Sequence, residues 1–310
     1  MNKLSKLFTR VFEQNIFFDL GRRPKDSELM SSRLDQLFLK IEELKTFIAQ
    51  KPEFIFANDT EILVENDTFF FAFPSDEVNH ALSFLNFSFD IGLRRFIGYH
   101  ATSGGVYLDI GSNVGVMCAV AARQIGSQGL VISVDPIPKM TEFVARNIAL
   151  NCPHTNHKHY ACAIGKESEK RELQLVKGDN RVSTLYQYEE ANIVDRSINI
   201  EVEVKTVEDV LPLGKSSYLI KIDAEGAEFY ILKDLFALLC KEKVIEAIVI
   251  FEFAVEHFNR AETDPNDLID LLELYKLQAR YINPVSGVLE GQFSKISFNM
   301  PGNLAVLILK

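Results

Sequence analysis

The stretch Val106-Tyr-Leu-Asp-Ile-Gly-Ser-Asn-Val-Gly115 decides the fold of this chain. Residues 106–110 form a short apolar run with one acid, which is typical of a strand buried on both faces of a parallel sheet. Gly111 and Gly115 follow it, and glycines allow a tight turn and the close approach of a ligand to bare backbone. The apolar segment 116–125 then predicts a helix whose first N–H groups and positive dipole end point at that ligand. The pattern indicates a strand, a ligand-binding turn and a helix.

The spacing of the glycines separates two classes of nucleoside cofactor. The dinucleotide fingerprint G-x-G-x-x-G, placed on Gly111, needs glycines where this chain has Asn113 and Val116. A nicotinamide-dependent oxidoreductase is therefore the less favoured interpretation. The pattern D-x-G-x-N-x-G instead suits the amino-acid end of S-adenosylmethionine, with the Asp109 carboxylate available to its cationic amine.

A second acid supports the same fold. Asp135 ends the next mostly apolar run, residues 130–134, about 20 residues past the glycine turn. An acid at this position accepts hydrogen bonds from ribose hydroxyls. Both cofactor classes need that acid, so Asp135 supports the nucleoside-binding fold without choosing between them.

Composition limits the class of partner and the compartment. The chain has 310 residues, enough for a large α/β domain with an extension, and 33 Lys and Arg against 43 Asp and Glu give a net charge of -10. This balance disfavours a nucleic-acid or anionic-membrane surface and favours a small or neutral substrate. The four cysteines form no C-x-x-C pair, and no apolar run approaches the ~20 residues of a membrane span. We expect a cytoplasmic protein without a membrane span.

Residues 1–95 predict an N-terminal extension of helices and short strands. Residues 27–50 predict a helix, because apolar residues recur at alternating spacings of four and three, namely Met30, Leu34, Leu37, Ile41, Leu44 and Ile48. This helix either packs on its own domain or forms a short coiled coil between two subunits, and the second interpretation predicts a homodimer. Residues 54–73 predict two or three short strands, and residues 76–98 predict a helix.

Residues 96–310 predict an α/β domain, because strand and helix patterns alternate along the chain. We expect strands at 106–110, 130–134, 158–164, 218–222, 245–253, 280–283 and 304–309, and helices at 116–125, 138–151, 227–240 and 264–277. Residues 166–205 interrupt this rhythm with two half-buried strands and a polar loop at 177–184, which is long enough to reach over a site. We interpret them as a β insertion.

Charged residues cluster at the end of the strand at 218–222. Lys221 and Asp223 lie two apart, on one face, and an unpaired buried charge would cost several kcal/mol, so they are paired or lie at the open end of the strand. Glu225 and Glu228 follow in the first turn of the next helix, where the dipole favours carboxylates. Ligands of open α/β sheets bind beyond the carboxyl ends of the strands, so we expect this acidic turn to face the glycine turn.

Two further residues complete the predicted catalytic group. Glu252 lies near the end of the strand at 245–253, and His257 follows one turn on. His257 titrates nearest neutral pH and is the predicted general base, with Glu225 and Glu252 orienting the acceptor. A divalent metal held by these acids and His257 is the alternative.

Several motifs between residues 100 and 255 together resemble the FkbM family of S-adenosylmethionine-dependent methyltransferases. They are Asp109-Ile-Gly-Ser-Asn-Val-Gly115, Val134-Asp-Pro136, Asn147 to Asn151, Ala163-Ile-Gly165 and, above all, Ile220-Lys-Ile-Asp-Ala-Glu-Gly-Ala-Glu228. The resemblance implies a class I methyltransferase fold, in which a seven-stranded, mostly parallel sheet has its last strand antiparallel and carries helices on both faces. It also implies O-methylation of a hydroxyl, on a sugar or glycan or on a small natural product.

The resemblance also implies roles for single residues. The glycine turn would hold the methionine end of S-adenosyl-L-methionine, Asp135 the ribose, and the region of Ala163 the adenine. The predicted cofactor-binding residues are Asp109, Gly111, Ser112, Asn113, Gly115, Asp135, Pro136, Ala163 and Asp223. A catalytically silent interaction module that keeps the fold is the alternative function.

Overall fold

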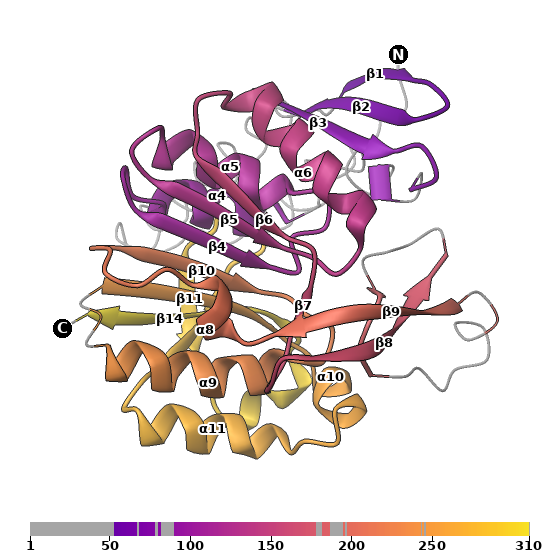
Figure 1. The fold of residues 1–310 in the computed structure, drawn as a ribbon. Helices are drawn as coiled ribbons and strands as arrows, with labels where there is room; N and C mark the ends of the chain where they lie inside the picture. The colour runs from indigo at the N-terminus through magenta and orange to yellow at the C-terminus, as the bar shows by residue number, and fades with distance from the viewer. Residues whose placement is uncertain are drawn as a thin grey trace, which may run out of the picture. The chain divides into compact units, whose positions relative to one another are not determined.

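The computed structural model describes residues 53–309, apart from 67, 78–79, 82–89, 178–181, 187–194, 196, 243 and 245. Residues 51–310 form one compact unit (Figure 1). The predicted helix at 27–50 lies outside the described residues, and with it the predicted contact between subunits. The predicted domain boundary near residue 95 remains a prediction.

The core of this unit is an eight-stranded sheet with the order β13-β12-β14-β11-β10-β4-β5-β6 (Figure 1). Its parallel part consists of β11 (Glu246–Phe253), β10 (Tyr218–Ile222), β4 (Val106–Ile110), β5 (Leu130–Val134) and β6 (His157–Tyr160). The last strand, β14 (Gly302–Leu309), pairs antiparallel with both β11 and β12 (Ala279–Ile282). The predicted class I methyltransferase fold is confirmed, with β13 (Leu289–Gln292) as an additional antiparallel edge strand.

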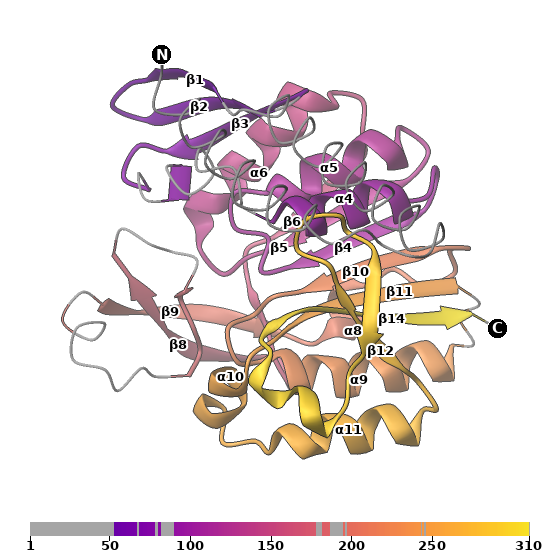
Figure 2. The same ribbon diagram turned by 180° about the vertical axis from the view of Figure 1, so that it is seen from behind.

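Helices cover both faces of this sheet (Figures 1 and 2). One face carries α4 (Ile91–His100), α5 (Val116–Ile125) and α6 (Pro138–Asn151). The other carries α8 (Val207–Val210), α9 (Glu228–Lys241) and α11 (Pro265–Leu274), and the short α10 (Val255–Arg260) follows β11. Side chains of β4 alternate between the two cores, because Tyr107 packs with the first group of helices while Leu108 packs with the second.

Most predicted elements agree with the structure, and the differences have local causes. The strand predicted at 158–164 is two strands, because β6 ends at Tyr160 and β7 (Ala163–Ile164) leaves to pair with β9 (Ser197–Lys205) in another sheet. Within the helix predicted at 76–98, the described residues His80 and Ala81 are helical, and α4 begins at Ile91 after Asp90, which adopts a left-handed conformation with φ 47°. The strand pattern did not predict β13, and the helices α8 and α10 are also additional.

A small antiparallel sheet of β1 (Glu53–Ala57), β2 (Glu61–Asn66) and β3 (Phe69–Pro74) packs against α6, which confirms the strands predicted there. Two asparagines of α6 bind the edge of β3 that faces away from β2. Asn147 accepts a hydrogen bond from the Ala72 N–H at 2.6 Å and donates to the Ala72 carbonyl at 3.0 Å. Asn151 does the same with Phe70, at 2.9 and 2.7 Å. These two amides, one helical turn apart, take the place of a neighbouring strand.

A third sheet, with the order β7-β9-β8, contains the long hairpin of β8 (Glu169–Val176) and β9. In the segment between these two strands, Thr184 forms an isolated bridge with Gln174 of β8, and its hydroxyl donates to the Glu225 carbonyl in the turn after β10. The third sheet therefore holds residues 183–185 beside the carboxyl ends of the parallel strands, as expected for the polar loop.

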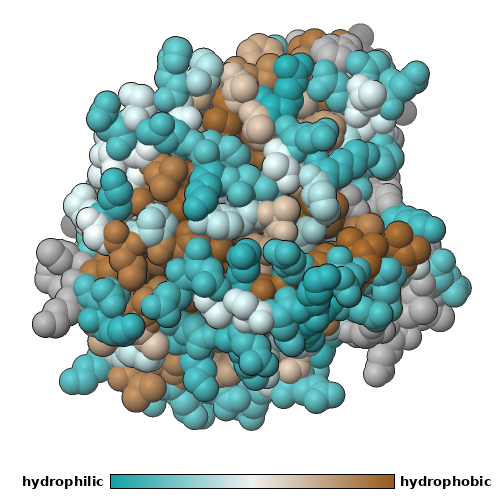
Figure 3. Space-filling view, viewed as in Figure 1, coloured by the Kyte–Doolittle hydropathy of each residue, from teal (hydrophilic) through white to brown (hydrophobic). Residues whose placement is uncertain are grey.

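The visible surface is mostly hydrophilic. Figure 3 shows hydrophobic residues on this face in separate groups between hydrophilic ones, without a continuous apolar band. Within the described ranges, every helix is too short or too polar to cross a membrane.

Candidate functional site

A cavity of about 240 Å³ lies at the carboxyl ends of β4, β5, β10 and β11. Its wall combines the turns after β4 and β5, the strand β7, the loop 183–185, the turn after β10, and Glu252. The carboxyl ends of parallel strands meet at one edge of the sheet, and ligands of open α/β sheets bind there. The position therefore agrees with the one predicted for the acidic turn and the glycine turn.

The turn after β4 has a shape that requires glycine. Gly111 has φ +77°, and a Cβ atom at this position would overlap with the carbonyl oxygen of Asp223. Gly115 has φ +79°, and a Cβ atom there would lie 2.9 Å from the Val144 side chain of α6. These two close approaches pack the turn between the turn after β10 and helix α6.

A buried hydroxyl in this turn is available to a ligand. The backbone N–H of Ser112 donates to the Val134 carbonyl at 3.1 Å. Its side-chain oxygen is buried and has no hydrogen-bond partner among the described residues. Buried polar atoms are normally hydrogen-bonded, and Ser112 lines the cavity, so its hydroxyl is a ready donor or acceptor for a bound molecule.

Asp135 is held in a fixed orientation at the end of β5. One carboxylate oxygen accepts from the Asn113 N–H at 2.8 Å and the other from the Ile137 N–H at 2.9 Å. Burial raises the pKa of Asp135 to about 6, although both hydrogen bonds lower it. Each oxygen keeps a further lone pair, so this carboxylate can still accept hydrogen bonds from ligand hydroxyls.

Asp109 lies behind the cavity wall, not in it. Its side chain is fully buried, 3.2 Å from the Lys221 ammonium and 3.2 Å from the Tyr107 hydroxyl. The same ammonium lies 3.2 Å from Asp223, so it joins the ends of β4 and β10. This arrangement argues against the predicted contact between Asp109 and the amine of a cofactor, because Lys221 already supplies the cation.

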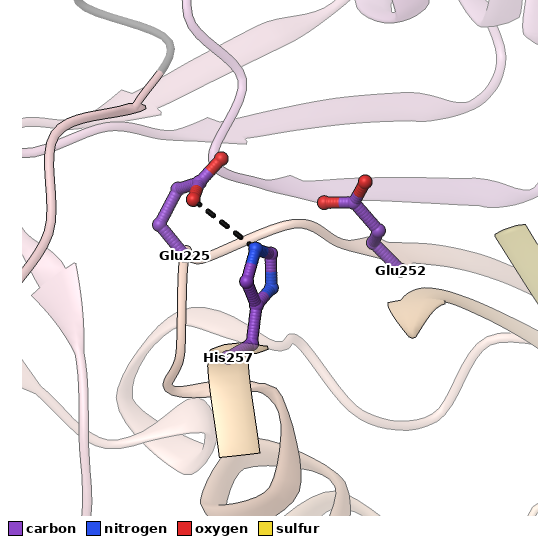
Figure 4. A group of neighbouring side chains, drawn as sticks. All are labelled: Glu225, Glu252 and His257. Atoms are coloured by element: carbon purple, nitrogen blue, oxygen red, sulfur yellow. Dashed lines mark ion pairs between the residues drawn. The ribbon is translucent and has the colours of Figure 1, made fainter. Parts of the chain in front are cut away.

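The acids after β10 have different partners. Glu228 is buried and accepts from the Ala224 and Gly226 N–H groups, both at 2.8 Å, so it holds the turn that precedes α9. Glu225 lies in the cavity wall with its carboxylate 3.3 Å from the His257 Nε2 atom and 3.7 Å from the Arg260 guanidinium (Figure 4). Glu228 is therefore structural, whereas Glu225 faces the cavity as half of an ion pair.

The two carboxylates near His257 favour its protonated form. Burial lowers its pKa, but Glu225 and Glu228 outweigh that effect and raise it to about 11. The Glu228 carboxylate contributes by charge, since it lies 3.7 Å from Nδ1, outside hydrogen-bond distance. A protonated imidazole has no lone pair for a proton, which argues against the predicted role of His257 as the general base.

Glu252 lines the cavity at the end of β11 and is half-buried. Figure 4 shows it on the other side of the His257 ring from Glu225. Burial, together with the neighbouring carboxylates of Asp223, Glu225 and Glu228, raises its pKa to about 8, while the positive charge of His257 lowers it. Glu252 is therefore the acid in this wall that most readily takes up a proton near neutral pH.

A metal ion is the alternative use of these side chains. Within the described part of the chain, Glu225, Glu252 and His257 each place a ligand atom within 4.8 Å of the other two. The ion pair between Glu225 and His257 already satisfies two of these three side chains. A metal ion bound by all three side chains would therefore have to replace this ion pair.

Most predicted site residues line the cavity. The predicted cofactor residues in its wall are Gly111, Ser112, Asn113, Asp135, Pro136, Ala163 and Asp223. Gly115 and Asp109 support the turn from outside the wall, and His257 lies behind Glu225. The sequence did not single out Thr184 and Arg260, which donate to the Glu225 carbonyl at 2.5 and 3.3 Å. A spacing of three from His257 on one helix was the available signal for Arg260.

Comparison with solved structures gives distant similarities. A putative rRNA methylase from Clostridium thermocellum has a TM-score of 0.40 at 11% identity, covering 70% of this chain and 94% of that chain. An S-adenosylmethionine-dependent O-methyltransferase from Thermotoga maritima has a TM-score of 0.38 at 10% identity, covering 82% and 79%. M. jannaschii TYW2 in complex with AdoMet has a TM-score of 0.38 at 10% identity, covering 82% and 87%. These scores are too low to assign an activity, and the fold assignment rests on the sheet topology.

Comparison by sequence gives a family. No curated protein matches the chain. A family model described as Vibrio cholerae RfbT protein matches residues 35–309, which is most of the chain. The match is to this model and not to the FkbM family, so the predicted FkbM membership remains a prediction. The chain belongs to the family of the Vibrio cholerae RfbT protein.

Proposed function

We propose that this protein is an S-adenosylmethionine-dependent methyltransferase that methylates a hydroxyl group. The observation that carries the proposal is the cavity wall itself, which combines a glycine-shaped turn, the unpartnered Ser112 hydroxyl and the fixed Asp135 carboxylate. When bound, S-adenosylmethionine supplies an electrophilic methyl group on a cationic sulfur. The Asp223 carboxylate of the same wall suits such a cation.

The residues that would hold the cofactor follow from their positions. Gly111 and Ser112 would bind its amino-acid end, since the turn offers close backbone approach and a hydroxyl. Asp135 would accept from the ribose hydroxyls. The side chains beyond Asp135, including Ile137 and Ala163, are apolar and would contact the adenine.

The proposed acceptor is a hydroxyl of a glycan or a small natural product. The segment 220–228, which resembles the FkbM pattern, supports this choice. The carboxylates of Asp223 and Glu225 also support it, because they disfavour a phosphate-rich acceptor such as a nucleic acid. A catalytically silent module would not need Ser112 and Asp135 to remain available in the wall, so it is the weaker candidate.

Calorimetry tests the cofactor. Wild-type protein should bind S-adenosylmethionine and its demethylated product, and should not bind NADH. Asp135→Ala should weaken binding by about 1 to 3 kcal/mol, because hydrogen bonds to a charged acceptor are lost. The control is Asp270→Ala on the exposed side of α11, which should leave the affinity unchanged. Binding of NADH without binding of either methionine-derived nucleoside would overturn the proposal.

A further inference from the structure

We propose that Glu252 takes the proton of the acceptor hydroxyl, and that the neighbouring ion pair of Glu225 and His257 tunes the charge around the Glu252 carboxylate. This inference rests on the proposed function. In the step, the hydroxyl oxygen forms a bond to the methyl carbon, and the bond from that carbon to sulfur breaks with its electron pair left on sulfur. The hydroxyl proton passes to the Glu252 carboxylate, so charge and atoms balance.

The position of Glu252 in the sheet suits the acceptor side of the cavity. Asp135 follows β5 and Glu252 lies in β11, and the order β11-β10-β4-β5 separates their strands by three strand spacings, about 14 Å. A cofactor whose ribose binds Asp135 therefore leaves the β11 side of the cavity to the acceptor. In the parallel pairing of β10 and β11, Phe251 lies beside Ile222, so Glu252 is level with Asp223 at the strand ends.

Among the acids at the ends of β10 and β11 and in the turn after β10, the other carboxylates have partners, which leaves Glu252 able to accept a proton. Asp223 pairs with the Lys221 ammonium at 3.2 Å, and Glu228 accepts from two backbone N–H groups. Glu225 is held by His257 and Arg260. Glu252 lines the cavity, and within the described residues no hydrogen bond or ion pair to its carboxylate is seen. A general base must reach the proton it takes, and this carboxylate faces the cavity without competition.

The groups around Glu252 raise its affinity for a proton. Asp223 and Glu225 face it from the turn after β10, Glu228 from α9 and His257 from α10. On the remaining side, its register partner in β14 is Asn303, which does not titrate. Burial and three carboxylates raise the pKa of Glu252, and the His257 cation opposes them. A base with a pKa near the working pH removes a proton most effectively.

The same charges give His257 a role that acts through Glu252 by electrostatics. Its cation pairs with Glu225 at 3.3 Å and lowers the pKa of Glu252. Loss of this cation should therefore raise the pKa of Glu252. The base form of Glu252 exists above its pKa, so the rising limb of the pH profile should move to higher pH in His257→Gln.

Carboxyl NMR of the full chain, labelled with ¹³C at glutamate, is the first test. A resonance that is absent from Glu252→Gln should titrate well above the ordinary glutamate range, and it should move to still higher pH in His257→Gln. The exposed Glu256 gives the matched control variant, Glu256→Gln, which should retain the Glu252 resonance and its titration. A Glu252 carboxyl that titrates in the ordinary range overturns the inference whatever the acceptor is.

Turnover with a panel of methyl glycosides is the second test. Glu252→Gln should lose about 10² to 10⁴-fold in rate, the usual contribution of a general base, while Glu256→Gln stays at the wild-type rate. Calorimetric affinity for S-adenosylhomocysteine should stay within threefold in both variants. A Glu252→Gln rate within threefold of wild type overturns the inference. Failure of the wild type to bind S-adenosylhomocysteine would instead overturn the proposed function.

Discussion

Gly111 lies where the turns after β4 and β10 meet, and no other residue fits there. Gly111→Ala should destabilise the protein by about 1 to 2 kcal/mol for its positive φ and by about 1 to 3 kcal/mol more for overlap with the Asp223 carbonyl. The control is Gly214→Ala, because Gly214 has φ +86° with nothing within 4 Å of the added Cβ atom and should show the φ cost alone. Urea denaturation measures both. Equal losses in the two variants would contradict the close approach.

Single residues also show where prediction from sequence stops. The places of Glu225, Glu252 and His257 after neighbouring strands were sufficient to predict that they lie together, because strand ends in a parallel sheet converge. Their protonation depends on partners that no spacing reveals. Two carboxylates keep His257 charged, and three raise the pKa of Glu252. The predicted residues were therefore brought together, but the predicted division of roles between base and orienting groups was not supported.

Helix α6 connects the small N-terminal sheet to the glycine turn at residues 111–115 through one side chain, that of Asn147. The Asn147 amide is fully buried, binds Ala72 of β3 and donates to the Val114 carbonyl at 2.7 Å. Asn147→Ala should cost about 1 to 3 kcal/mol, because buried backbone groups lose their partners, and it should weaken cofactor binding through the turn. Asn151→Ala is the control, since its half-exposed position lets water replace the lost bonds to Phe70. Thermal unfolding and calorimetry measure the two effects. An equal loss in both variants would argue against a special role for Asn147.

Elements with a clear period were predicted well, and elements set by tertiary pairing were not. β4, β5, α5 and α6 have the predicted bounds, because each is a continuous apolar run or an amphipathic repeat. β6 and β7 form one run in sequence, yet they belong to different sheets, since β6 pairs with β5 and β7 pairs with β9. β13 has little apolar character, and it is a strand because β12 offers it an edge. Such choices depend on neighbours far away in sequence.

The cavity as a whole combines parts of the molecule that are distant in sequence. The large sheet supplies the strand ends, the third sheet supplies β7, Leu173 of β8 and the loop 183–185, and His80 comes from the segment after β3. The alternation of strands and helices in the sequence predicts the contribution of the large sheet, which is its strand ends. The others depend on how the hairpin of β8 and β9 returns to the site, which Thr184 secures by its bond to the Glu225 carbonyl.

The predicted helix at 27–50 bears on the assembly of the whole molecule. Residues 51–310 form a compact unit of their own, so removal of residues 1–50 should leave a folded protein. The apolar residues that recur along 27–50 at spacings of four and three form a seam on the predicted helix. If this seam joins two subunits, the truncated protein should be a smaller species in light scattering. In the full chain, Leu37→Glu places a charge in the seam and should have the same effect, whereas the neighbouring Gln36→Glu, outside the seam, should not. S-adenosylhomocysteine affinity checks that each variant is folded. An unchanged size for folded truncated protein would show that the helix packs within its own subunit.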